Sequence, residues 1–238
     1  RHALQGTRLG FYYNAAELAD LRRFGMVPEQ ARMVAIPGSG ADTDRFAPQP
    51  MPAGAPVFLF IARMLRSKGL EDLLTATRAL RAEGRRFRVE LLGPTDSNPD
   101  AIDEATLRQW HAAGEVTWHG ATRDVRPYVA AAHVLVLPSW REGTPTSIME
   151  GMSMGRPAVV TDAPGCREVV RPGVNGYLVP VRDPQALASA MEAFITSPQD
   201  IARMGQAGRE LALSEFDAEK VAARILEDMH VPATEDAL

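Results

Sequence analysis

The feature that most constrains the fold is an alternation, from Pro56 onward, between short apolar runs and longer amphipathic segments. Runs that are apolar throughout are typical of strands buried on both faces, and amphipathic segments at helical spacing are typical of the helices that cover them. Strands joined by such helices form a parallel sheet with helices on both sides. The alternation therefore predicts an α/β domain built on a doubly wound, Rossmann-like parallel sheet.

The individual runs give the expected elements. Strands are predicted at 57–62, 87–93, 116–119, 133–139, 156–162 and 176–181. Helices are predicted at 70–84, 102–111, 125–131, about 148–154 and, in more than one piece, from 184 to about 229. The first helix is predicted to end at Gly84, and these residues recur in it at helical spacing: Leu70, Leu73, Leu74, Thr77 and Leu80.

The predicted Rossmann-like domain covers 56–215, and the rest of the chain divides into three stretches. The proline-rich FAPQPMPAGAP predicts a linker over 46–55. Residues 1–45 hold one helix between two apolar runs, which is too little for a domain, and the chain does not start with Met. We therefore expect a remnant of a neighbouring, missing domain there. Residues 216–238 are expected to form a C-terminal helix and tail, with the helix packed on that domain, frayed, or docked elsewhere.

Charge and cysteine content exclude several classes of protein. Lys and Arg number 26 against 30 Asp and Glu, a net charge of −4, so no bulk attraction favours nucleic acid or an anionic membrane. The single cysteine, Cys166, excludes a disulfide framework and fits a reducing compartment. No run reaches the ~18 apolar residues of a membrane span, and the first residues lack the apolar core of a signal peptide. A cytoplasmic protein is expected.

A cluster of cations follows the first strand of this domain. Ligands of open parallel sheets bind beyond the carboxyl ends of the strands, and ARMLRSKG places Arg63, Arg66 and Lys68 at such an end. Arg offers a planar donor fork and Lys a mobile point charge, a pair suited to the two phosphates of a diphosphate. The alternative is that these cations are solvated surface residues before a helix, and their spacing alone does not separate the two interpretations.

The segment WREGTPTSIMEGMSMGRP, after the strand at 133–139, is the second candidate. Its turn precedes an apolar helix, so free amides, those of Thr144, Thr146 and Ser147 among them, are expected to face an anion or a sugar. Glu142 before the turn and Glu150 in the helix are expected to accept from ligand hydroxyl groups. Ser147-x-x-Glu150 also fits a capping box, in which the acid satisfies amides at the helix start, and both roles can coexist.

Other residues are weaker candidates. The histidines show no zinc-ligand spacing, and His119 and His133, near strand ends, are better interpreted as structural. Cys166 has no partner base in the pattern and is interpreted as structural as well. No GxxxxGK[ST] loop occurs, so a nucleotide site of the P-loop kind is unsupported.

Together these segments resemble one family. IPGSGADTDRF, FIARMLRSKGLEDLL and the stretch from His133 to Asp183 follow in the order and spacing of the nucleotide-sugar-binding half of retaining glycosyltransferases of the GT-B fold, in the group called family 4. The resemblance spans about residues 10–215. Its most specific part is an E-x7-E pair, Glu142 and Glu150, in the context PS-x-x-E-G-x-P-x-S-x-x-E.

The resemblance implies catalytic roles for three residues. Arg63 and Lys68 look like the pair that neutralises the donor diphosphate and stabilises the charge developing on the departing nucleoside diphosphate. Glu142 looks like the acid that binds the hydroxyl groups of the donor sugar. Members of this family generally need no metal ion or cofactor, since the Arg and Lys take the electrostatic place of a metal. Retention is expected to proceed by front-face attack, without a covalent intermediate on Glu142.

The resemblance also implies the remaining contacts to the donor. Glu150 looks like the acid that accepts from the ribose hydroxyls. The segment from Gly120 to Arg123 is expected to lie beside the base. The donor-binding loop is expected to consist of Gly143, Thr144, Pro145, Thr146 and Ser147, and its free amides are expected to donate to the sugar and the distal phosphate.

One departure from the family pattern bears on the substrates. Many relatives have Pro-Asn-Gly-Val-Asp where this chain has PGSGAD, from Pro37 to Asp42. The variant resembles a subgroup that assembles lipid-linked bacterial oligosaccharides, so the expected donor is a UDP-hexose or a UDP-N-acetylhexosamine. The expected acceptor is a surface glycan or a lipid-linked glycan. The acceptor-binding N-terminal domain, through which a peripheral contact with the inner membrane would run, is expected to be missing, so this chain alone is expected to bind donor and transfer little.

Two other functions stay open on the sequence. The first is a non-catalytic sugar-nucleotide-binding subunit, although a retired site has little reason to keep Arg63, Lys68, Glu142 and Glu150 together. The second is a sugar-nucleotide epimerase or hydrolase of related fold. Such an enzyme would be expected to place His or further acids at the strand ends, and the pattern shows none.

Overall fold

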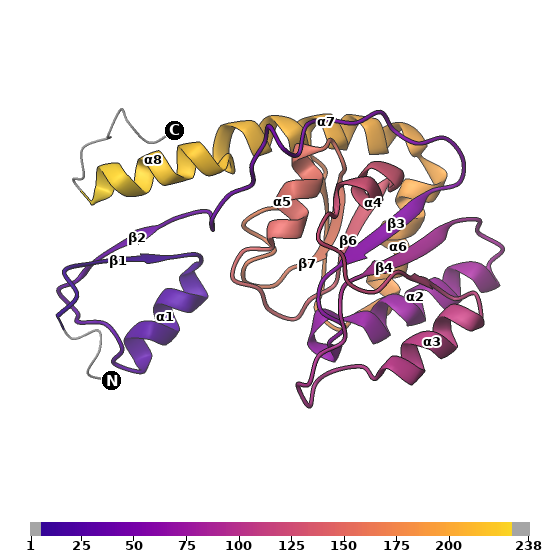
Figure 1. Cartoon of the computed structure of the whole chain (residues 1–238), viewed down its shortest axis with the longest axis horizontal. Helices are drawn as coiled ribbons and strands as arrows, with labels where there is room; N and C mark the ends of the chain where they lie inside the picture. The colour runs from indigo at the N-terminus through magenta and orange to yellow at the C-terminus, as the bar shows by residue number, and fades with distance from the viewer. Residues whose placement is uncertain (1–5, 230–238) are drawn as a thin grey trace.

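The computed structural model describes residues 6–229, which form a large α/β domain and a smaller N-terminal unit beside it (Figure 1). The domain is built on a 6-stranded sheet in the order β5-β4-β3-β6-β7-β8, with every neighbouring pair parallel. Numbered along the domain, this is the order 3-2-1-4-5-6 of dinucleotide-binding folds. The strands are β3 (Val57–Ile61), β4 (Arg88–Leu92), β5 (Thr117–Trp118), β6 (Val134–Leu137), β7 (Ala158–Thr161) and β8 (Gly176–Val179).

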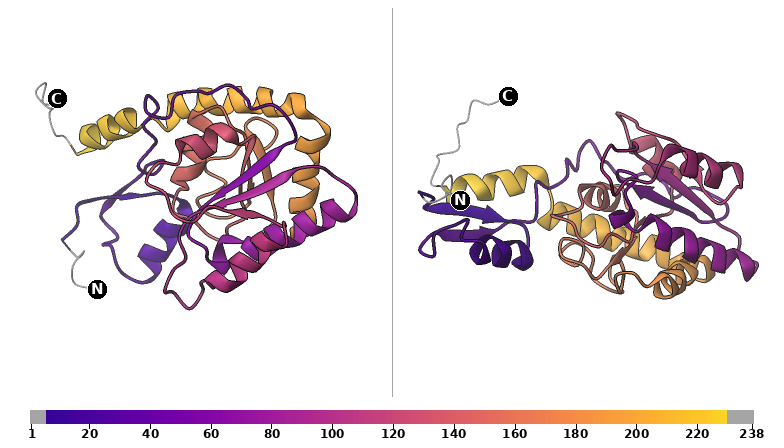
Figure 2. Two further views of the ribbon diagram at one scale, coloured as in Figure 1. Left: turned by 45° about the vertical axis from the view of Figure 1, so that its right-hand side comes forward. Right: turned by 90° about the horizontal axis from the view of Figure 1, so that it is seen from below.

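Helices cover both faces of this sheet (Figures 1 and 2), which confirms the predicted doubly wound fold. On one face lie α2 (Leu70–Ala82), α3 (Glu104–Ala112) and α6 (Pro184–Thr196). On the other lie α4 (Arg126–Ala131), α5 (Thr146–Ser153) and α7 (Pro198–Glu215), with α7 packed on α5. Because the strand order reverses between β3 and β6, right-handed crossovers carry the helices to opposite faces.

The core follows the predicted pattern closely. Strand β6 is buried along its whole length, as expected for a central parallel strand. Helix α2 buries all the positions predicted for it, with Ala76 in addition, and ends before Gly84, which has the left-handed φ of +78°.

Several elements are shorter than predicted. Helix α3 starts at Glu104 because the Asp103 carboxylate accepts from the Thr106 amide at 2.8 Å and caps it.

The N-terminal unit consists of β1 (Leu9–Tyr12), α1 (Ala15–Arg23) and β2 (Arg32–Ala35). The two strands pair in parallel, and no residue of α1 is fully buried. The unit therefore has no core of its own within the described residues. Residues 1–5 of the predicted remnant and the predicted tail at 230–238 lie outside the described part of the chain.

Helix α8 (Ala218–Asp228) leaves the domain and lies along β2 (Figure 1). Its last residue, Asp228, forms an ion pair with Arg32 of β2. The start of α8 is hydrogen-bonded to Ala41, which lies in the segment that connects β2 to the domain. The Ala41 amide donates to the Phe216 carbonyl at 2.7 Å, and the Ala218 amide donates to the Ala41 carbonyl at 3.0 Å. Of the outcomes expected for this helix, the structure shows a regular helix against the N-terminal unit.

The proline-rich stretch after Phe46 has no helix or strand, but it is held along the domain. Arg156, 1% exposed, donates to the carbonyls of Gln49 and Pro50, each at 2.9 Å. The stretch predicted as a linker is thus anchored at its middle by a buried guanidinium. Within residues 6–229, every helix is too short or too polar to cross a bilayer.

Candidate functional site

The candidate site lies where β3 and β6 are neighbours in the sheet and the chain turns in opposite directions from their carboxyl ends. The loop after β3 carries Arg63 and Lys68, and the loop after β6 carries Glu142 and leads into α5. In doubly wound sheets this reversal opens the crevice in which ligands bind. The two segments singled out in the sequence therefore meet at this crevice.

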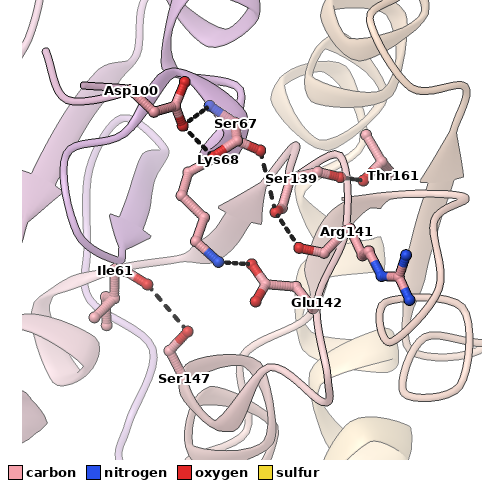
Figure 3. A network of polar contacts seen from close by, with 9 residues as sticks. All are labelled: Ile61, Ser67, Lys68, Asp100, Ser139, Arg141, Glu142, Ser147 and Thr161. Carbon is pink, nitrogen blue, oxygen red and sulfur yellow. Dashed lines mark hydrogen bonds and ion pairs between the residues drawn. The ribbon is translucent and has the colours of Figure 1, made fainter. Parts of the chain in front are cut away.

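Lys68 and Glu142 form the centre of the site (Figure 3). The Lys68 Nζ donates to Glu142 Oε1 at 2.6 Å, and the two side chains are only 17% and 14% exposed. Two charges that are this far desolvated stabilise one another, and removing one leaves the other uncompensated. Any ligand that draws Lys68 away must therefore offer Glu142 new donors.

Lys68 is aimed by the short 3-10 turn Arg66–Lys68 that precedes α2. Asp100, from the turn after β4, accepts from the amide of Ser67 at 3.0 Å and also from its hydroxyl (Figure 3). The following Gly69 has φ +75°, and a Cβ there would lie 2.1 Å from the Pro138 carbonyl oxygen. This close approach to the end of β6 requires glycine and brings Lys68 beside the Glu142 loop.

The start of α5 presents donors without acceptors. Within residues 6–229, no acceptor is recorded for the amides of Gly143, Thr144, Thr146 and Ser147. The helix begins after Pro145, which offers no side-chain cap. Free amides at a helix start carry partial positive charge and bind anions or sugar oxygens. The predicted array of free amides is thus present.

The capping-box interpretation of Ser147 and Glu150 is wrong. Ser147 is the second residue of α5 rather than its N-cap, and its hydroxyl donates to the Ile61 carbonyl at 3.1 Å (Figure 3). Glu150 is half-buried, and among residues 6–229 no hydrogen bond or ion pair is recorded for its carboxyl group. Burial raises the pKa of Glu150 to about 7, an effect that the charge of Arg45 opposes. This acid is therefore available to a ligand.

Arg63 does not join Lys68 and Glu142. Its guanidinium donates to Asp96, after β4, at 2.7 Å, and its side chain is 57% exposed. The hydrogen bond from the Asn98 amide and, to a smaller extent, the one from Arg63 hold the pKa of Asp96 below its ordinary value. Arg66 points away as well, to Glu71 at the start of α2. Of the predicted cations, the structure places only Lys68 against the acid.

The segment predicted to lie beside the base follows β5. The Gly120 carbonyl accepts from the Gly93 amide at 2.8 Å, which ties this loop to the end of β4, and Arg123 is exposed. Neither residue contacts Lys68 or Glu142 among the recorded hydrogen bonds. The loop lies at the same edge of the sheet, two strands beyond the Arg63 loop, with β4 between them.

The structural interpretation of three other residues is consistent with their surroundings. Cys166 is fully buried, and burial, with the charge of Glu142 adding to it, raises the pKa of its thiol to about 12. The His133 Nδ1 accepts from the Val57 amide at 3.1 Å, at the amino end of β6. The His119 Nε2 lies 3.0 Å from Glu90 and its ring packs on Tyr128. In the part of the chain that the structure describes, no cluster of metal-ligating side chains is present.

A cavity of about 560 Å³ adjoins the Lys68–Glu142 pair, and the N-terminal unit forms part of its wall. Sequence reasoning missed this contribution, although Asn14 before a helix is an ordinary N-cap signal. The cavity is lined by Asn14, Glu17, Ser67, Lys68, Trp140, Arg141, Glu142 and Gly143.

Comparisons with known proteins agree with this architecture. The model of the family described as glycosyl transferases group 1 matches residues 55–197. The lipopolysaccharide core biosynthesis glycosyltransferase LpsE of Rhizobium meliloti is 28% identical over 190 residues, which cover 80% of this chain and 52% of LpsE. Sucrose-phosphate synthase from Thermosynechococcus elongatus has a TM-score of 0.81 at 27% identity, over 95% of this chain and 59% of its own.

A further solved structure shows the same fold. HepE from Anabaena, in complex with UDP-glucose, has a TM-score of 0.76 at 21% identity, over 94% of this chain and 64% of its own. This chain spans about half the length of the curated relatives that it matches, for example 55% and 52% of two of them. Because the family model covers most of the domain, including both loops of the site, the chain belongs to the glycosyl transferases group 1 family.

Proposed function

We propose that this chain forms the donor-binding part of a retaining glycosyltransferase of the GT-B fold, in family 4. The observation that carries the proposal is the meeting of Lys68, Glu142 and the free amides of α5 at the reversal of the strand order. A cation and amides suit a diphosphate, and a carboxylate suits the hydroxyl groups of a sugar. A sugar linked to a nucleoside diphosphate combines these groups.

The roles of the residues follow from an exchange of partners. The diphosphate would take Lys68 from Glu142, and the sugar hydroxyls would donate to the carboxylate that is released. Both buried charges stay paired in this exchange, which avoids the cost of an isolated charge. Glu150 would accept from the ribose hydroxyls. Arg63 would leave Asp96 for the diphosphate at little cost, because the pair is largely exposed.

Transfer would then rest on charge stabilisation. Negative charge develops on the diphosphate as the bond to the sugar breaks, and Lys68, Arg63 and the amides of α5 would stabilise it in the place of a metal ion. Front-face attack, with the donor phosphate helping to remove the acceptor proton, would retain the configuration at the sugar carbon.

The substrates are proposed from the relatives. HepE was solved with UDP-glucose, and LpsE is named for lipopolysaccharide core biosynthesis. By analogy we propose a UDP-linked donor and a bacterial surface-glycan or lipid-linked acceptor, with the reaction at the cytoplasmic face of the inner membrane. The N-terminal unit would be the edge of the acceptor-side domain.

Calorimetry with UDP, GDP, ADP and UDP-glucose tests the proposal. UDP should bind, and Lys68→Gln should weaken it by about 1–3 kcal/mol, the value of a charge-assisted hydrogen bond. Arg66→Gln is the matched control, because Arg66 lies on the same turn but pairs with Glu71 in solvent. Glu142→Gln should weaken UDP-glucose more than UDP. Equal UDP affinity for Lys68→Gln and the wild type would refute the site.

A further inference from the structure

The Asn14 side chain joins the N-terminal unit to the loop that carries Glu142. It is 5% exposed and is bonded at both ends of its amide group. Its Oδ1 accepts from the Glu17 amide at 3.0 Å and so caps α1, and its Nδ2 donates to the Gly143 carbonyl at 3.1 Å. The two partners fix the orientation of the group, because an N–H requires the oxygen and a carbonyl requires the nitrogen.

The loop around Glu142 is held from two sides. On the domain side, the Glu142 amide donates to the Pro164 carbonyl at 2.9 Å, and a Cβ on Gly165 would lie 2.4 Å from the Glu142 carbonyl oxygen. On the other side the N-terminal unit supplies three contacts: Asn14 bonds Gly143, the Tyr13 ring would lie 3.2 Å from a Cβ on Gly143, and Asp20 pairs with Arg141 at 2.7 Å. Helix α1 and the residues before it therefore hold both neighbours of Glu142.

The bond to Gly143 also fixes the next amide. The Gly143 carbonyl and the Thr144 N–H belong to one planar trans peptide unit, in which they point in opposite directions. A glycine before such a unit allows the plane to turn over easily, because no Cβ opposes the rotation. Asn14 holds the carbonyl toward the N-terminal unit, so the Thr144 N–H, which has no recorded acceptor among residues 6–229, is held away from that unit.

We propose that Asn14 is a positioning residue that locks the Gly143–Thr144 peptide, so that the Thr144 amide faces the donor beside Glu142. The inference rests on the proposed function of this site. Asn14 lines the cavity next to the Lys68–Glu142 pair, but both ends of its amide group are already bonded within the protein, so it acts through the loop rather than on the ligand. A residue of the N-terminal unit thereby sets the geometry of a site built on the domain.

Two substitutions of Asn14 separate this role from helix capping. Asn14→Asp and Asn14→Ser both keep an oxygen that can cap α1. The Asp variant turns an acceptor toward the Gly143 carbonyl, and the Ser side chain is too short to reach it. Asp103→Asn is the matched control, because Asp103 caps α3 without touching the site. We expect UDP-glucose affinity to fall about 5- to 10-fold in both Asn14 variants, the value of a lost hydrogen bond, and to stay unchanged in the control.

A readout without ligand keeps the test independent of the donor. In ¹⁵N-labelled wild-type protein the Gly143 and Thr144 amides should each give one sharp resonance, and in Asn14→Asp they should double or broaden as the peptide turns over. Unchanged resonances in Asn14→Asp would overturn the inference, as would unchanged UDP-glucose affinity in a wild type that binds it. If the wild type binds no UDP compound while the resonances do change, the proposed donor fails and the role of Asn14 in positioning the peptide stands.

Discussion

Replacing Glu150 by Gln removes a charge from a buried position with little change of shape. Burial raises the pKa of this carboxyl from 4.5 to about 7. At 1.36 kcal/mol per unit this shift corresponds to about 3 kcal/mol. Since the half-buried group keeps part of its solvent, we expect about 1–2 kcal/mol to be expressed in stability. The Gln side chain is neutral at every pH and does not bear this cost.

The sign of the effect follows from proton linkage. The folded-state pKa lies above the unfolded one, so the stabilisation that goes with protonated Glu150 is fully present below pH 4.5 and is lost as pH rises through about 7. Urea denaturation should therefore show Glu150→Gln close to wild type near pH 4.5 and more stable by about 1–2 kcal/mol at pH 8. The exposed Glu83, replaced by Gln, is the control and should show no such trend.

Donor binding should reverse the shift. Ribose hydroxyls that donate to the carboxylate favour its charged form, so the pKa of Glu150 falls and a proton is released. Calorimetry with UDP-glucose at pH 6.5, in two buffers of different ionisation enthalpy, measures this release directly, because its diphosphate does not titrate there. The wild type should release a proton and Glu150→Gln should not. A stability difference that is constant from pH 4.5 to 8, or equal proton release in both proteins, would refute the reasoning.

Three further outcomes are expected. Gly69→Ala should lower the free energy of unfolding by about 2 kcal/mol or more, because the new Cβ would clash with Pro138. Gly84→Ala is the control: Gly84 has a similar φ but lies in open space, so its loss should be about 1 kcal/mol. Equal losses in urea denaturation would contradict the close approach of Gly69 to Pro138. Arg156→Met should cost about 3 kcal/mol in the same assay, since five carbonyls lose the buried guanidinium that donates to them, and a loss below 1 kcal/mol would show that solvent replaces it. EDTA should leave UDP affinity measured by calorimetry unchanged, because Lys68 supplies the positive charge; a marked loss would show that a metal ion takes part.

Much of the fold was predictable because it depends on local patterns. The apolar run of β3 and the spacing of Leu70 to Leu80 in α2 each report burial directly, and alternation of such segments implies a parallel sheet. Adjacency of the Lys68 and Glu142 loops then follows from the rule that ligands bind beyond the carboxyl ends of strands. Their direct ion pair, across 74 positions of sequence, needed the structure.

The parts that were missed depend on which partner a side chain selects. Arg63 follows β3 as Lys68 does, but Asp96 on the neighbouring strand end takes its guanidinium. Ser147 and Glu150 have the spacing of a capping box, but the Ser147 hydroxyl donates to the Ile61 carbonyl and the helix starts two residues earlier than a capping box would place it. Asn14 lies 129 positions from Gly143, and no local pattern reports a contact of that range.

The course of α8 has a consequence for dividing the protein into pieces. By position in the chain this helix is an appendix of the domain, yet its Asp228 bonds Arg32 and its Val221, 4% exposed, lies buried near the start of the helix. A truncation after Glu215 would therefore remove helix α8 from the N-terminal unit while leaving the sheet of the α/β domain intact. The N-terminal unit together with α8 is not one continuous stretch of polypeptide. An expression fragment that contains both would require the two ends of the chain.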